Sequence, residues 1–143
     1  MIIKQLSAFL ENKKGRLCEA TDVLAKNGID ISALSLADTA EFGVLRLIVD
    51  NPEKAKELLK ESGVVVRVSR VIAVAMDDVP GGAVSILNIL SQNGINIEYM
   101  YACVGKETGK ALMVLRTDDI DGTEEVLHKN GCGEINPADI YRI

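Results

Sequence analysis

Two short segments combine a glycine turn with the start of an amphipathic helix, and this combination can bind an anion. The segments are Asn12-Lys-Lys-Gly-Arg-Leu17 and Asp78-Val-Pro-Gly-Gly-Ala83. A glycine turn that leads into a helix exposes backbone N–H groups beside the positive end of the helix dipole. A carboxylate group suits such a place, and the α-carboxylate of a free amino acid is one example.

A ligand that also carries an ammonium group needs hydrogen-bond acceptors. Asn12, Asp77 and Asp78 in the glycine segments can supply them, as can Asp30 and Asn96, which follow Asn-Gly pairs. Backbone carbonyl groups of an edge strand are a further source. The two glycine segments and the two Asn-Gly pairs are therefore the candidate binding elements.

The same residues also have structural explanations. Glycine suits turns and helix starts, which accounts for Gly15, Gly81 and Gly82. Short polar side chains after a turn commonly bond to nearby backbone, which accounts for Asp30 and Asn96. The sequence alone leaves both explanations open.

Other reactive residue types form weaker patterns. His128, the only histidine, lies on an expected helix, and no motif places a nucleophile beside it. The cysteines form no metal or redox motif and are expected to be small buried hydrophobic residues: Cys18, Cys103 and Cys132. The acidic residues at 118, 119 and 121 lack the spacing of a calcium loop and are expected to cap a helix. We expect no catalytic residue, metal site or cofactor.

The elements that position the glycine segments occur twice along the chain. Residues 15–36 match residues 81–102 at an offset of 66 positions, and both stretches contain the pattern NGIxI. Later matches, such as Asp50 with Asp118, move to an offset of 68. A repeat of this length predicts two copies of one small domain, 1–69 and 70–143, rather than a solenoid.

Hydrophobic periodicity predicts the order β, α, β, β, α, β in each copy. The first copy has expected strands at 2–10, 29–37, 44–50 and 64–68, with helices that begin at Gly15 and Pro52. The second copy has expected strands at 71–76, 95–104, 111–117 and near Ile140, with helices at 81–93 and 123–130.

A βαββαβ unit usually folds as a ferredoxin-like sandwich, in which both helices cover one face of a four-stranded antiparallel sheet. The fold class is therefore α+β, with two such sandwiches in tandem. The second strand of each unit is expected at a sheet edge, where a second copy can pair with it. If Leu45, Leu47 and Val49 face the helices, then Val44 and Ile48 form an apolar outer face that another copy or chain is expected to cover. Edge-to-edge and face-to-face packing both remain open.

Composition excludes several classes of partner. The chain has 143 residues, 48% hydrophobic content and a net charge of −5, and its 16 Lys and Arg are scattered. The negative charge and the scattered cations argue against nucleic acid, whose binding depends on clustered positive charge. No stretch approaches the roughly 20 apolar residues of a membrane span, and the N-terminus lacks a signal-peptide pattern. We therefore expect a cytoplasmic protein with no membrane partner.

The segments Asp78-Val-Pro-Gly-Gly-Ala83 and Asn93-Gly-Ile-Asn-Ile97 resemble the signature of the ACT domain, a small regulatory module of amino-acid metabolism. That signature is close to D-x-P-G-x-L, a helix, and G-x-N-I. The first copy is similar in both segments, although Lys14 replaces the usual proline and Asp30 stands where Asn is common. The resemblance covers the whole chain as a tandem pair and leaves no room for a catalytic domain.

In the ACT family, free amino acids commonly lie between the first loop of one unit and the second strand of its neighbour. The resemblance therefore implies two equivalent sites, one of which combines Asn12–Leu17 with Asn96–Tyr99, and the other Asp78–Ala83 with Asp30–Ala33. The implied ligand-binding residues are Asn12, Gly15, Arg16, Leu17, Asp30, Ile31, Ser32, Asp78, Gly81, Gly82, Ala83, Asn96, Ile97, Glu98 and Tyr99. The two sites differ in charge, so unequal binding is expected.

Three functions follow from these patterns. The first is a non-enzymatic sensor that binds a free amino acid, forms a homodimer and acts on an enzyme or regulator of amino-acid metabolism. The second is a small acylphosphatase-like enzyme that uses Arg16, for which the second copy has no equivalent. The third is an interaction domain without a ligand.

Overall fold

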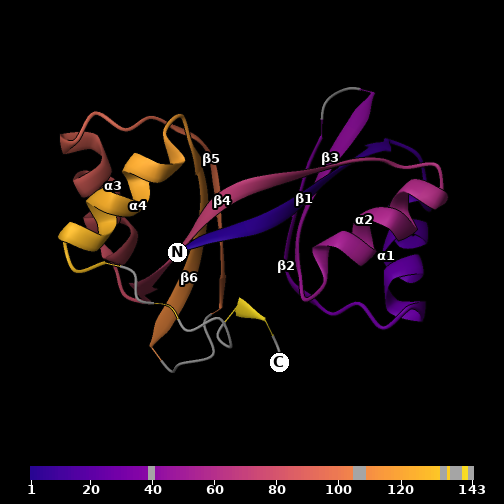
Figure 1. The fold of residues 1–143 in the computed structure, drawn as a ribbon, viewed down its shortest axis with the longest axis horizontal. Helices are drawn as coiled ribbons and strands as arrows, with labels where there is room; N and C mark the ends of the chain where they lie inside the picture. The colour runs from indigo at the N-terminus through magenta and orange to yellow at the C-terminus, as the bar shows by residue number, and fades with distance from the viewer. Residues whose placement is uncertain (39–40, 105–108, 133–134, 136–139, 142–143) are drawn as a thin grey trace. The chain divides into compact units, whose positions relative to one another are not determined.

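The computed structural model describes residues 1–38, 41–104, 109–132, 135 and 140–141. Within these ranges ten helices and strands follow one another (Figure 1). They are β1 (Ile2–Glu11), α1 (Arg16–Lys26), β2 (Ile31–Asp38), β3 (Phe42–Val49), α2 (Pro52–Glu61), β4 (Val65–Asp77), α3 (Gly82–Gln92), β5 (Ile97–Val104), β6 (Lys110–Thr117) and α4 (Ile120–Lys129).

The chain divides into two compact units, and each unit holds a chain end from the other repeat. The first-repeat unit consists of Lys4–Ser69 and Ile140–Ile143. The second-repeat unit consists of Met1–Ile3 and Arg70–Asp139. The division passes between Ser69 and Arg70, inside the continuous strand β4.

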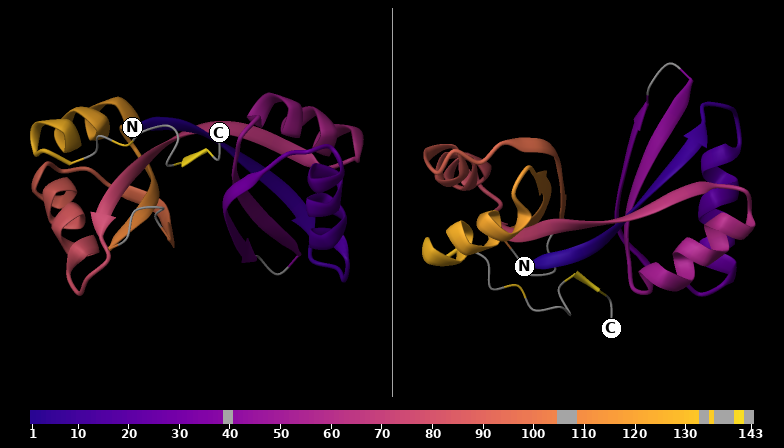
Figure 2. Two further views of the ribbon diagram at one scale, coloured as in Figure 1. Left: turned by 90° about the horizontal axis from the view of Figure 1, so that it is seen from below. Right: turned by 45° about the horizontal axis from the view of Figure 1, so that its top comes forward.

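Each unit has the strand order of a ferredoxin-like sandwich. The hydrogen-bonded order is β2-β3-β1-β4 in the first-repeat unit and β5-β6-β4-β1 in the second. Neighbouring strands pair antiparallel in β1–β3 and β4–β6, for example with Leu6 opposite Leu47 and Ala73 opposite Val114. Figure 2 shows that the helices of each unit lie together on one face of that unit's sheet. The predicted α+β fold with two ferredoxin-like sandwiches is confirmed.

Alternating side chains build one helix-facing core in each unit. In the first-repeat unit, Leu45, Leu47 and Val49 pack with Leu24 and Leu59 of the helices, as predicted. In the second-repeat unit the core comprises Ile72, Val74, Ile86, Leu90, Met113, Leu115, Ile120 and Leu127. On the opposite face Ile48 is fully buried and Val44 is half-buried. The expectation that another copy or chain covers these two residues stays a prediction.

The fourth strand of the second repeat differs from the prediction. A strand was expected near Ile140, but Ile140 and Tyr141 belong to no strand and lie in the first-repeat unit. Residues 136–139 and 142–143 of that expected strand lie outside the described residues. The position beside β4 is taken instead by the start of β1, where the Met1 ammonium donates to the Ala73 carbonyl oxygen at 2.9 Å and Ala73 N–H donates back to Met1 at 2.9 Å.

Other local predictions have mixed outcomes. The two strands expected at 64–68 and 71–76 are one strand, β4. Pro52 does begin α2, and Asp119 does cap α4. The prediction that all three cysteines are buried is wrong, because Cys18 is exposed and the other two are only partly buried. Cys18 occupies an outward position of the amphipathic helix α1, so its small size does not bring it into the core.

Candidate functional site

The glycine turns begin α1 and α3, and no side chain of the described residues caps either helix. Gly15 precedes α1 with a φ of 86°, and Gly81 precedes α3 with a φ of 90°. Both values lie in the left-handed region that favours glycine. The other two helices are capped, since the side chain of Asn51 accepts from Lys54 N–H at 3.1 Å and that of Asp119 accepts from Gly122 N–H at 3.0 Å. The uncapped helix starts are therefore confined, among the described helices, to the two segments predicted to bind an anion.

The two glycine turns differ at the residue after the left-handed glycine. A Cβ atom on Gly82 would lie 2.0 Å from the carbonyl oxygen of Asp77, so only glycine fits there. The equivalent residue in the first repeat is Arg16, whose guanidinium Nη1 donates to Glu19 at 3.1 Å. The first turn therefore carries a long cationic side chain where the second carries none.

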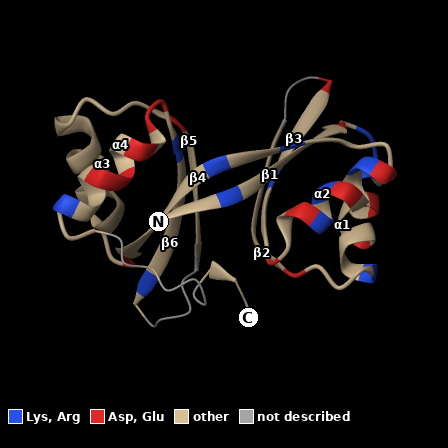
Figure 3. Ribbon diagram, in the orientation of Figure 1, with Lys and Arg blue, Asp and Glu red and all other residues tan. Residues whose placement is uncertain are grey.

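Charged side chains of the two turns are paired within their own units. Lys13 lies 2.8 Å from Glu11, and the hydrogen bond and charge of Lys13 lower the pKa of Glu11. In the second repeat, Lys110 lies 2.5 Å from Asp77. These pairs are exposed, so each contributes little to stability. Figure 3 shows basic residues on β1 and β4 and acidic residues on α2 and α4, where the equivalent pairs Lys4–Glu53 and Arg70–Asp121 occur.

An aspartate holds the start of the second strand in both repeats. The Asp50 carboxylate accepts from Asp30 N–H at 3.2 Å, and Asp50 N–H donates to the Asp30 carbonyl oxygen at 3.2 Å. Asp118 makes the same reciprocal pair with Asn96, at 3.1 Å and 3.2 Å. We call this arrangement the aspartate clamp. It fixes the backbone at the two positions that follow the Asn-Gly pairs.

A β-bulge follows each aspartate clamp. Pairing with β3 shifts between Ile31 and Ala33, and pairing with β6 shifts between Ile97 and Tyr99. Ser32 and Glu98 are therefore the extra residues of the two edge strands. Bulges re-aim side chains and are common beside functional sites.

The two bulge residues have different surroundings. The Ser32 hydroxyl is buried and has no hydrogen-bond partner in the described part of the chain. An unmet buried hydroxyl costs about 1–3 kcal/mol. Glu98, in contrast, accepts from Arg116 Nε at 3.3 Å, and Arg116 Nη1 also donates to the Arg70 carbonyl oxygen at 2.7 Å. The bulge of the second repeat is thus closed by an ion pair.

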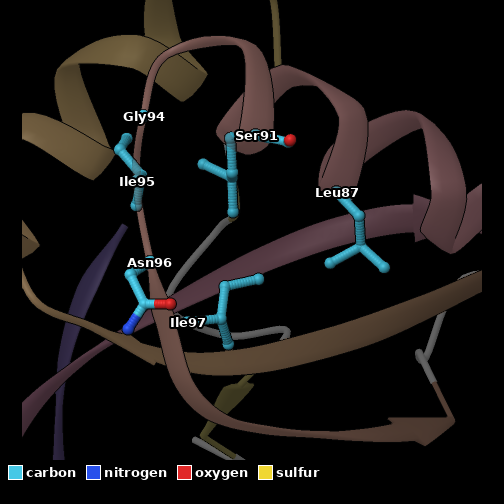
Figure 4. A pocket seen from close by; sticks show the side chains of 7 residues that line it. Leu87, Ser91, Gly94, Ile95, Asn96 and Ile97 are labelled. Atoms are coloured by element: carbon cyan, nitrogen blue, oxygen red, sulfur yellow. The ribbon is translucent and has the colours of Figure 1, made fainter.

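A shallow hollow of about 420 Å³ lies beside the clamp of the second repeat. Leu87, Leu90 and Ser91 of α3 line one side, and residues 94–97 line the other. Figure 4 shows Leu87 on the helix and Ile97 on the strand facing the same space, with Asn96 beside it. A second hollow of about 330 Å³ lies at the end of β1 in the first-repeat unit and includes Asn12.

Within one unit, the glycine turn and the strand start lie at opposite ends of the sheet. Glu11, next to the turn, pairs with Phe42, whereas Ile31 pairs with Val49 at the other end of β3. Seven steps along a strand span roughly 20 Å. The second repeat has the same geometry, with Asp77 opposite Lys110 and Ile97 opposite Thr117. A small ligand cannot reach both groups of predicted residues in a single unit.

The structure therefore sorts the predicted site residues into two groups per unit. One group surrounds the glycine turn and comprises Asn12, Gly15, Arg16 and Leu17, or Asp78, Gly81, Gly82 and Ala83. The other begins the edge strand and comprises Asp30, Ile31 and Ser32, or Asn96, Ile97, Glu98 and Tyr99. Asp50, Asp118 and Arg116 were not predicted as site residues. The match of Asp50 with Asp118 between the repeats was the available signal for two of them.

Other kinds of site find no support in the described residues. No group of three or more His, Cys, Asp or Glu among them is arranged to hold a metal ion. His128 lies exposed in the last turn of α4. Burial raises the pKa of the Cys103 thiol, which lowers the fraction of the reactive thiolate. None of the helices in the described ranges has the length and apolar character needed to cross a membrane.

Comparisons with known proteins agree with the repeat architecture. A family model described as an ACT domain pair matches residues 1–143. The chain is 41% identical to a crystallised protein from Bacteroides thetaiotaomicron, with a TM-score of 0.91, and the match covers 100% of this chain and 98% of that one. No curated protein matches the sequence significantly.

Two more distant structures share the fold. The regulatory subunit of aspartate kinase from Thermus thermophilus is 14% identical with a TM-score of 0.65, and the match covers 90% of this chain and 96% of that one. E. coli aspartokinase III, crystallised in complex with lysine and aspartate, is 19% identical with a TM-score of 0.52, over 90% of this chain and 32% of that one. At these identities the similarity shows the fold alone.

Proposed function

The chain belongs to the family of ACT domain pairs, and from this membership we propose that it is a regulatory module that binds a free amino acid. The observation that carries the proposal is the coincidence of two features in each repeat. A helix start without a side-chain cap follows the glycine turn, and an aspartate clamp fixes the edge strand. The first suits a carboxylate, and the polar groups at the second suit an ammonium.

The proposed ligand lies between the glycine turn of one unit and the edge strand of another. This geometry is supported by the separation of the two groups within each unit, which no free amino acid spans. The second unit of each site belongs either to the same chain or to a second copy. The proposed residues are those of the two sorted groups, with Asp50 and Asp118 in supporting positions.

A homodimer is part of the same proposal. The strands β2 and β5 are edges of their units, and edge strands offer unpaired backbone groups to another chain. Leu34 and Leu36 on β2 are 54% and 48% exposed, and Met100 on β5 is 39% exposed. Burial of these side chains would stabilise edge-to-edge pairing. Regulation then follows if the amino acid favours one assembly state, because the coupling is reciprocal.

The acylphosphatase-like alternative gains no support from the first glycine turn. Arg16, its essential cation, donates to Glu19, and the second repeat has Gly82 in its place. We therefore retain binding rather than catalysis as the proposed activity, acting on an enzyme or regulator of amino-acid metabolism.

A thermal-shift screen tests the proposal. Each of the twenty amino acids is added separately to the purified chain, with lysine and aspartate first because one structural relative was crystallised with them. Saturation at 100 times the dissociation constant adds about 2.7 kcal/mol of stability, or a rise in Tm of about 5–10 °C for a chain of this size. For a chiral amino acid that raises the Tm, its D-enantiomer is the matched control. A screen in which none of the twenty raises the Tm would overturn the proposal.

A further inference from the structure

The β-bulge places different residues at one position of the two repeats. Ser32 and Glu98 are equivalent at the offset of 66, and each lies two residues after the residue that an aspartate clamp holds, Asp30 or Asn96. Because the clamps have the same geometry in both repeats, the backbone does not distinguish the two strand starts. The difference between them lies in the side chains.

The surroundings of Ser32 suit a ligand with an ammonium group. Its hydroxyl oxygen is buried and has no hydrogen-bond partner among the described residues, so it can accept a hydrogen bond from a bound donor. The neighbouring Asp30 carries a carboxylate at the clamped position. The residue equivalent to Arg116 is Ile48, which is fully buried, so no cation occupies that position in the first repeat.

The surroundings of Glu98 already contain a cation. Arg116 donates to the Glu98 carboxylate at 3.3 Å and to the Arg70 carbonyl oxygen at 2.7 Å, so its guanidinium is held at two points. The Arg116 side chain remains one-third exposed, so its charge is accessible from solvent. A ligand ammonium would have to displace the guanidinium or lie beside a like charge, and both are unfavourable.

We propose that Ser32 and Glu98 determine whether the amino acid binds at the start of β2 or at the start of β5. The start at Ser32 binds the ammonium end of the ligand, and the Glu98–Arg116 ion pair closes the start at Glu98. This inference rests on the proposed function and makes it more specific, because each chain then binds one amino acid rather than two.

Calorimetric titration tests the inference with the amino acid that gives the largest shift in the thermal screen. The wild-type chain is expected to bind one molecule per chain. Ser32→Ala is expected to weaken binding about tenfold or more, because a hydrogen bond to a charged group is lost, and Ser32→Thr is expected to restore it. Ser35→Ala, which removes a hydroxyl from the same strand, is the matched control and should bind as the wild type does.

A double substitution makes the second strand start resemble the first. Glu98→Ser with Arg116→Ile replaces both residues by their equivalents from the first repeat and is expected to raise the stoichiometry to two molecules per chain. A melting curve of the free variant checks that the second-repeat unit still folds. The single variant Arg116→Lys keeps a cation and is expected to remain at one molecule per chain.

The outcomes separate this inference from the function on which it rests. If no amino acid binds the wild-type chain, the proposed function and the inference both fail. If the wild-type chain binds two molecules, or if Ser32→Ala binds normally, the inference fails and the proposed function stands. A folded double variant that still binds one molecule also overturns the closing role of the ion pair.

Discussion

At the residue scale, the structure explains why position 82 is a glycine. From the sequence alone, a need of the turn and a contact with a ligand were equally good explanations. The glycine is required because a Cβ atom would lie 2.0 Å from the Asp77 carbonyl oxygen. Gly15 and Gly81 are likewise required by their left-handed backbone. Turn chemistry therefore suffices to explain these residues. The candidate site depends more on Ser32, whose buried hydroxyl has no hydrogen-bond partner among the described residues.

Substitution of Gly82 by alanine tests this reason. Gly82→Ala forces the turn to move away from Asp77, and overpacking of this kind costs about 1–3 kcal/mol of unfolding free energy. Arg16→Ala changes the equivalent position of the first repeat, where a Cβ already fits, and should stay within about 0.5 kcal/mol of the wild type. Urea unfolding measures both. Equal stability of the two variants would contradict the close approach at Gly82.

At the element scale, the sequence predicted most helices and strands because their hydrophobic periods are clear. The predicted strand ends differ from the observed ones by about two residues, because the turn residues beside a strand do not mark its exact boundary. The continuous strand β4 was divided in the prediction because Ser69 and Arg70 interrupt its apolar pattern. The sequence did not predict the two β-bulges, because a bulge depends on pairing with a neighbouring strand rather than on local sequence.

The aspartate clamp is the element-scale feature with the clearest test. Asp118→Ala removes the acceptor of Asn96 N–H and should speed hydrogen exchange at that amide, with a loss of about 1–2 kcal/mol of stability. Asp118→Asn keeps a side-chain oxygen and should preserve slow exchange at Asn96. Amide exchange followed by NMR distinguishes the two variants. The Asp30 amide, held by Asp50 in the other repeat, is the internal control and should not change.

The contrary outcome is unchanged hydrogen exchange at Asn96. If the Asn96 amide is as protected in Asp118→Ala as in the wild type, the Asp118 carboxylate does not hold the start of β5.

At the scale of the whole molecule, the repeat predicted two sandwiches but not the exchange of chain ends. The second-repeat unit takes Met1–Ile3 as the strand beside β4. The sequence of each repeat predicts a complete βαββαβ unit, so the order of elements does not indicate that the second-repeat unit takes a strand from the first repeat. We call this segment, Met1–Ile3, the borrowed strand. Two structural details account for the exchange. Ile3 is 4% exposed, and Ile2 N–H donates to Glu124 at 3.1 Å.

Fragments of the chain test the borrowed strand. A fragment of residues 70–139 lacks Met1–Ile3 and should lose about 2 kcal/mol or more, because full burial of one isoleucine alone contributes that amount. The same fragment with residues 1–11 joined through a flexible linker should recover a cooperative thermal transition. Circular dichroism follows both. If the unlinked fragment is as stable as the linked one, the strand does not complete the unit.

The borrowed strand also sets an order of events during folding. Met1 and Ala73, which are 72 positions apart, must meet before the second-repeat unit is complete. Pairing between distant segments raises the contact order, and folding rates fall as contact order rises. During synthesis, Met1–Ile3 precede the residues beyond Arg70 and must therefore wait for them before they reach their final partners. The two sandwiches are therefore similar in fold, but the second can be completed only after the start of the first repeat has reached it.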